Sequence, residues 1–155
     1  MKSRGIKRHK ALYPLSHHHH HGLVIAHRLM KAGTEESKFS NDELKQKLQE
    51  FWDSGGNEHF REEEELLLPV YAKYESLDRP EIVENLLEHV QIRSMVRQVL
   101  EQSTISESLM RELGTLLETH IRKEERVIFP FIEQALPEEE LLKLGSEFTD
   151  LTPGK

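Results

Sequence analysis

Residues 59–69 and residues 120–130 repeat one pattern whose side chains could bind a metal ion. Each segment reads His, an apolar residue, Arg, any residue, Glu, Glu, any residue, three apolar residues and Pro. Imidazole with carboxylate suits iron, zinc, copper or nickel, and a carboxylate that bridges two ions favours a two-metal site. The repeat therefore predicts chemistry built on bound metal.

Helical geometry brings the His and the first Glu of each repeat to the same side. At about 100° per residue, a side chain four positions later lies about 40° around the helix, so Glu63 follows His59 and Glu124 follows His120. Apolar residues share these faces, which predicts that both pairs point into a core. An unpaired buried carboxylate costs several kcal/mol, and a bound metal is the simplest way to stabilise it. The alternative is a metal-free polar core with a structural role.

Two further helices are expected to contribute histidines. His89 shares its face with apolar residues one and two turns away. The run from 17 to 21 is all histidine, and we interpret it as the start of a helix rather than the remnant of a purification tag. Periodicity does not separate His19 from His20, because each shares a face with Leu23 and Met30. We expect one or two of the five histidines to be ligands.

The elements that carry these residues are all predicted to be helices. We expect them from Ser16, as N-cap, to about Lys31, and from Ser40 through a kink at Gly55-Gly56 to about Tyr74. The other two are expected from a start within residues 78–81 to about Gln102, and from Ser106 to Gln134. The fold class predicted is all-α: an antiparallel up-down-up-down four-helix bundle with a short extra C-terminal helix after Pro137. The expected organisation is a basic irregular arm (1–14), the metal-binding bundle (15–136) and a short C-terminal helix and tail (137–155).

Composition narrows the classes of function. The chain has 155 residues, a net charge of −7, ten histidines and no cysteine. The lack of cysteine excludes thiolate zinc and iron–sulfur sites and suits a reducing cytoplasm, where we expect the protein. No apolar run is long enough to cross a membrane. The first ten residues are basic, but the remaining chain is acidic, so nucleic acid is not the expected partner.

These motifs together resemble the hemerythrin-like superfamily, in particular its bacterial HHE cation-binding domains. The resemblance covers roughly residues 9 to 136 and includes Glu88-His89 with Ile92-Arg93. It implies a four-helix bundle holding two iron ions, bridged by carboxylates and an oxo or hydroxo group, with zinc or another divalent metal as an alternative. It implies terminal ligation by His59, His89, His120 and one histidine of the first helix, with Glu63 and Glu124 bridging.

Two departures from the oxygen-carrying hemerythrins change the expectation. Arg93 stands where those proteins have a second histidine, and their spacing would select Glu125 instead of Glu124. On an ideal helix Glu125 faces away from His120 and could serve only if the helix bulges, so we favour Glu124. We expect substitution of Glu64, Glu65 or Glu125 to do little. Four histidines and two bridging carboxylates give roughly eight protein bonds against about a dozen positions on two octahedral ions.

This open coordination favours reaction with small molecules over clean reversible storage of oxygen. The predicted function is to bind, sense or buffer oxygen, nitric oxide or iron. The alternative is an enzyme, an iron-dependent oxidase or peroxidase, although no dedicated acid–base group is evident. A sensing role predicts a partner chain or a homodimer, and the C-terminal stretch is expected to pack either on the bundle or on a second subunit.

Overall fold

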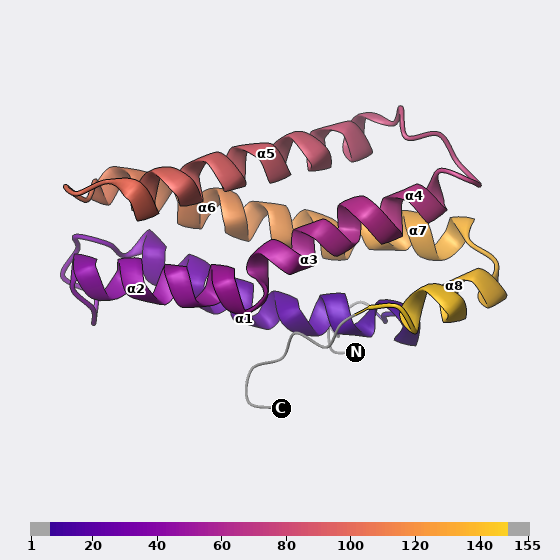
Figure 1. The fold of residues 1–155 in the computed structure, drawn as a ribbon, viewed down its shortest axis with the longest axis horizontal. Coiled ribbons are helices and arrows are strands. Elements are labelled where there is room, and N and C mark those ends of the chain that lie inside the picture. The colour runs from indigo at the N-terminus through magenta and orange to yellow at the C-terminus, as the bar shows by residue number, and fades with distance from the viewer. Residues whose placement is uncertain (1–6, 149–155) are drawn as a thin grey trace, which may run out of the picture.

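The computed structural model describes residues 7–148, and within them every regular element is helical. Four helical stretches run antiparallel to one another along the long axis of the molecule (Figure 1). They are α1 (Tyr13–Met30); α2 (Asn41–Phe51), α3 (Asn57–Glu62) and α4 (Leu68–Tyr71); α5 (Pro80–Glu101); and α6 (Glu107–Lys123) with α7 (Phe129–Ala135). The predicted all-α four-helix bundle is confirmed.

The helix ends follow local chemistry, with one correction. Ser40, where the second helix was expected to start, caps α2: its side chain accepts from the backbone N–H of Glu43, and the Glu43 carboxylate accepts from the backbone N–H of Ser40. Ser16 does not cap α1. That helix begins at Tyr13 and is preceded by a 3₁₀ turn over Lys10–Leu12, because a proline occupies its first turn and the preceding residues are anchored in the core.

Two wide π-helical turns interrupt the second and fourth stretches at the repeated motif. They cover Glu63–Leu67 and Glu124–Ile128, and Pro69 and Pro130 follow them closely. Proline has no N–H to give to the carbonyl four residues earlier, so the helix widens just before it. A third such turn, Trp52–Gly56, contains the predicted glycine kink.

The apolar core is split into two clusters by a layer of buried histidines and glutamates. One cluster includes Leu15, Tyr71 and Phe129, and the other includes Leu29, Leu48 and Leu113. In the second, α1 and α6 approach closely at Gly114, where a Cβ would lie 2.6 Å from the carbonyl oxygen of Ala26. Two separate apolar regions therefore hold the four helices together above and below a polar layer.

The extra C-terminal helix packs on the bundle of its own chain. In α8 (Glu138–Gly145), Leu141 and Leu144 are buried in the same cluster as Leu12. A Cβ on Gly145 would lie 2.8 Å from the Cα of Ala11, so the two ends of the described chain touch (Figure 1). Within residues 7–148, none of the helices has the length and apolar character that crossing a membrane requires.

The described part of the predicted basic arm is ordered against the bundle. The Arg8 guanidinium is almost fully buried and lies 3.1 Å from the carboxylates of both Glu125 and Glu133. It also lies over the ring of Phe129. Residues 1–6 of the predicted arm lie outside the described residues. Residues 7–9 have no regular secondary structure, and the 3₁₀ turn at Lys10–Leu12 and the start of α1 at Tyr13 follow them.

Candidate metal centre

Glu63 lies at the centre of the polar layer, between histidines of two helices. Its Oε2 is 2.8 Å from Nε2 of His59 on α3, and its Oε1 is 3.0 Å from Nε2 of His89 on α5. All three side chains are buried. The carboxylate therefore uses one oxygen toward each neighbouring imidazole.

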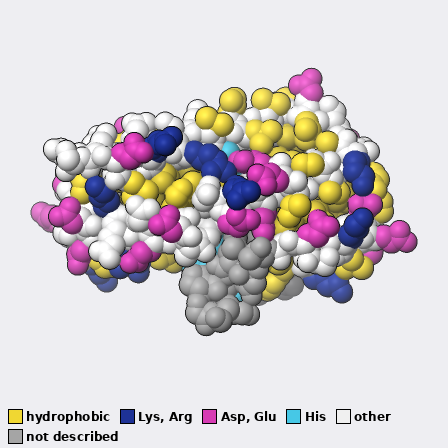
Figure 2. Space-filling view, in the orientation of Figure 1, with side chains coloured by type: hydrophobic (Ala, Val, Ile, Leu, Met, Phe, Trp, Pro, Cys, Tyr) yellow, Lys and Arg dark blue, Asp and Glu magenta, His cyan; other side chains and the backbone are white. Residues whose placement is uncertain are grey.

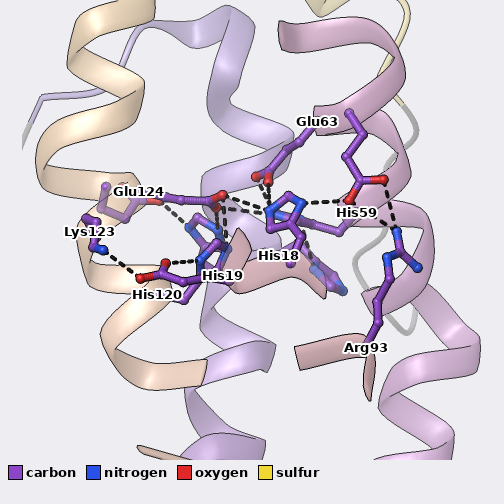
Figure 3. Close-up of polar contacts among 12 residues, drawn as sticks. His18, His19, His59, Glu63, Arg93, His120, Lys123 and Glu124 are labelled. Carbon is purple, nitrogen blue, oxygen red and sulfur yellow. Dashed lines mark hydrogen bonds and ion pairs between the residues drawn. The ribbon is translucent and has the colours of Figure 1, made fainter. Parts of the chain in front are cut away.

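Glu124 does the same from the fourth helical stretch. Its Oε1 is 3.0 Å from Nε2 of His19 on α1, and its Oε2 is 3.1 Å from Nε2 of His120 on α6. Figure 3 shows Glu63 and Glu124 reaching toward each other with the histidine rings between them. Each carboxylate spans two histidines, as a bridging ligand must.

The four histidines and two glutamates form two overlapping groups. In each group the candidate ligand atoms all lie within 4.8 Å of one another. Both groups contain both glutamates, which are the only shared members. The first adds His19 and His59, and the second adds His89 and His120.

Several atoms at this centre are buried without a hydrogen bond within the described chain. They include both carboxylate oxygens of Glu63 and the Nε2 atoms of His59 and His120. The Nε2 of His59 is close to Glu63 but is not aligned for a hydrogen bond. Polar atoms left in this state are costly, and coordination to a cation would satisfy all of them. The donor set thus fits a metal site.

In three of the histidines, the ring nitrogen that faces away from the centre, Nδ1, contacts a second carboxylate. The Nδ1 of His19 is 2.6 Å from Glu125. The Nδ1 of His89 is 2.7 Å from Glu64, and that of His120 is 2.7 Å from Glu88, where Nδ1–H donates to the carboxylate. Such hydrogen bonds fix the tautomer and ring orientation of an imidazole that ligates through Nε2.

Each of these outer carboxylates has a cation of its own. Glu125 pairs with Arg8, Glu64 with Arg93 at 3.3 Å, and Glu88 with Lys123 at 2.6 Å. Figure 3 shows Arg93 and Lys123 on opposite sides of the centre. In Figure 2 basic and acidic side chains lie together across the middle of the visible face, between two areas of hydrophobic side chains.

The electrostatics of the centre favour charged partners when no metal is bound. Burial lowers the pKa of His59, but the carboxylates of Glu63 and Glu124 outweigh it and raise the pKa to about 9. Burial also opposes protonation of His89, yet Glu124 and the other adjacent carboxylates raise its pKa to about 11. Burial would raise the pKa of Glu124, but the surrounding imidazoles hold it well below its usual range. An entering cation would therefore replace protons.

The first helix resolves the alternatives among its histidines. His19 faces Glu124, whereas His20 is exposed and its ring lies edge-on to that of His17. The structure thus brings His19 to the centre and not His20, which lies one residue beyond the buried face that contains Leu15, His19 and Gly22. His27 is also exposed and lies 2.8 Å from Glu118.

His18 is buried although the sequence did not single it out. Its Nδ1 is 3.2 Å from Nδ1 of His59, and its ring stacks on Phe51 with centroids 5.5 Å apart. Burial, together with the neighbouring His59 and His19, lowers the pKa of His18 to about 3. His18 is therefore a neutral imidazole behind His59.

A small cavity adjoins the centre on its apolar side. Its volume is about 20 Å³, and its lining includes His18, His59, His120, Phe51 and Gly22. Such a volume accepts one water or a diatomic molecule. The space next to the centre is therefore limited to very small molecules.

The structure corrects the expectation that Glu64 and Glu125 are bystanders. Both lie beside histidines of neighbouring helices, which a wheel drawn for one helix does not represent. Glu125 does not take the place of Glu124: it contacts Nδ1 of His19, on the far side of that ring from Glu124. The sequence repeat contains a feature that marks both residues: Glu64 directly follows Glu63, and Glu125 directly follows Glu124.

Comparison with known proteins agrees with this arrangement. The family model described as Hemerythrin HHE cation binding domain matches residues 10–132, which is most of the chain. No curated protein and no solved structure matched the chain.

Proposed function

Since the chain belongs to the hemerythrin HHE cation-binding domain family, we propose that it holds two iron ions in the bundle core and uses them to bind, sense or buffer oxygen, nitric oxide or iron. His19, His59, His89 and His120 would be terminal ligands, and Glu63 and Glu124 would bridge the ions. An oxo or hydroxo group would complete the bridge. We place the protein in the cytoplasm, which suits a chain without cysteine.

One observation carries the proposal: two groups of ligand atoms share both glutamates. A single-ion site would need only one group. A metal-free core would need hydrogen bonds that the Nε2 atoms of His59 and His120 and the carboxylate of Glu63 do not have within the described residues. Two ions with shared carboxylates account for both facts. Iron is the metal that the family resemblance favours, and imidazole with carboxylate is compatible with it.

The reactive ligand is proposed to be diatomic because of the space beside the centre. The cavity of about 20 Å³ is lined mainly by apolar side chains such as Phe51 and Ile121 and has no room for an organic substrate. When bound, the iron pair would supply redox chemistry. The chain's own residues hold the ions, orient the imidazoles and keep bulk water away.

The test is metal content and an optical spectrum of the untagged protein, isolated in air and after anaerobic loading with Fe²⁺. About two irons per chain with near-ultraviolet oxo-bridge bands would support the proposal. One zinc ion, or no metal together with stability unaffected by chelator, would contradict it. Rapid turnover of added peroxide would instead promote the enzyme alternative.

A further inference from the structure

The four inward histidines do not have equivalent support. Behind His19, His89 and His120 the partner of Nδ1 is a carboxylate at 2.6–2.7 Å. Behind His59 the partner is the imidazole of His18, at 3.2 Å. The ring of His18 is held in place, because it is buried and stacked on Phe51.

The chemistry of the imidazole fixes the direction of this hydrogen bond in the metal-bound protein. A ring that ligates through Nε2 carries its proton on Nδ1, so His59 would donate and the Nδ1 of His18 would accept. His18 would then carry its own proton on Nε2. A carboxylate behind an imidazole increases the basicity of the ligating nitrogen, and a neutral acceptor does so less.

The two ligand groups differ in what their histidines contact through Nδ1. His89 and His120 belong to the same group, and both have a carboxylate behind them. His59 shares its group with His19, so that group contains the one histidine supported by a neutral ring. Both groups share the glutamates, so the contrast comes from the histidines.

We propose that His18 is a positioning residue that orients His59 and leaves the metal position between His19 and His59 the weaker and more exchangeable of the two. This inference rests on the proposed two-ion function. The small cavity reaches the ring of His18 as well as that of His59. The cavity also touches His19 of the same ligand group, whereas of the other group it touches only His120, so the proposed weaker position has more contact with open space.

The experiment is a stepwise titration of the metal-free full-length protein with Zn²⁺ against a competing chelator, with ring ¹⁵N spectra of the histidines. In the unchanged protein, His89 and His120 should respond to the first equivalent, and His19 and His59 to the second. His18 should show the neutral form protonated on Nε2. A His18 ring protonated on Nδ1, or equal filling of both positions from the first equivalent, would overturn the inference.

Two variants separate positioning from packing. His18→Phe keeps a ring against Phe51 but removes the acceptor, and it should weaken only the second binding step, by about 10- to 100-fold. His18→Asn keeps an acceptor near the same place and should stay within about threefold of the unchanged protein in both steps. His20→Phe is the matched control on the exposed side of α1 and should change neither step.

The outcomes distinguish the inference from the function on which it rests. Fewer than two Zn²⁺ bound by the unchanged protein would contradict the two-ion function and the inference together. Two ions bound, with His18→Phe altering neither step or both steps equally, would overturn the inference alone.

Discussion

The two copies of the repeated motif have the same sequence pattern but different surroundings. In both, the first glutamate enters the centre and the second reaches a histidine on a neighbouring helix: Glu64 reaches His89, and Glu125 reaches His19. The copies differ behind their own histidines. Glu88 supports His120, whereas His18 supports His59. A local motif therefore specifies which side chains point inward, and the neighbouring helices decide how basic and how firmly held each one is.

The central glutamates should give the largest effects and should differ from each other. Glu124 lies within 4 Å of all four histidines, whereas Glu63 contacts His59 and His89. Replacing either by Gln keeps the volume but removes the anionic bridge, so the metal pair should be lost. We expect Glu124→Gln to retain less metal than Glu63→Gln, measured as ions per chain after loading. Two ions retained by Glu124→Gln would show that it is not a bridge.

The second glutamates of the repeats should give a smaller but clear effect. Glu64→Gln and Glu125→Gln leave the ligands in place and weaken their support, which typically costs about 10- to 100-fold in metal affinity. Competition with a chelator measures this loss, with far-ultraviolet circular dichroism to check the fold. Glu65→Gln is the matched control, because Glu65 is exposed and pairs only with Arg61 among the described residues. Equal affinities for all three variants would restore the view that these glutamates are bystanders.

The histidines of both copies should also make metal binding depend on pH. The pKa of His59 is raised to about 9, so His59 is protonated at pH 7.5 in the metal-free protein, and the carboxylate of Glu124 raises the pKa of His120 as well. Coordination needs the deprotonated nitrogen, so Zn²⁺ uptake should release protons and tighten as pH rises toward 9. Titration calorimetry in two buffers of different ionisation enthalpy counts these protons. Uptake without proton release would contradict the charged state inferred for the centre.

The same shift has a consequence for stability without metal. A pKa raised from 6.5 to about 9 means that the pairing of His59 stabilises the fold fully below pH 6.5 and that this contribution is lost as pH rises through about 9. The metal-free protein should therefore melt at lower temperature at pH 9.5 than at pH 7. Bound metal should reduce that difference, because it holds the deprotonated ligands.

Much of the centre could be predicted because it depends on the periodicity of single helices. The spacing of His59 and Glu63, and of His120 and Glu124, places each pair inward whichever helices surround it. The choice between His19 and His20 could not be made this way. It depends on how α1 is rotated, which is set by an earlier start at Tyr13 and by the anchoring of Leu12 in the core.

The supporting residues could not be predicted for a related reason. Glu125 lies about 140° from His120 on an ideal wheel, and its partner His19 belongs to another helix. The wide turns before Pro69 and Pro130 also change the rotation of the residues within them. Contacts between helices therefore need the packed structure, although the second glutamate of each repeat marked the right positions in the sequence.

The smallest effect on metal affinity is expected from substituting the arginine that occupies the third position of each repeat, Arg61 or Arg122. Arg61 is exposed and pairs with Glu65 at 3.3 Å, and Arg122 pairs with Glu118 at the same distance. Exposed ion pairs one turn apart contribute little to stability, and neither arginine contacts a candidate ligand in the described structure. Arg61→Gln and Arg122→Gln should keep metal affinity within about twofold, measured by the same chelator competition. A tenfold loss in either variant would mean that the repeated arginine acts on the centre, and the shared pattern would then have a third functional member besides its histidine and its glutamates.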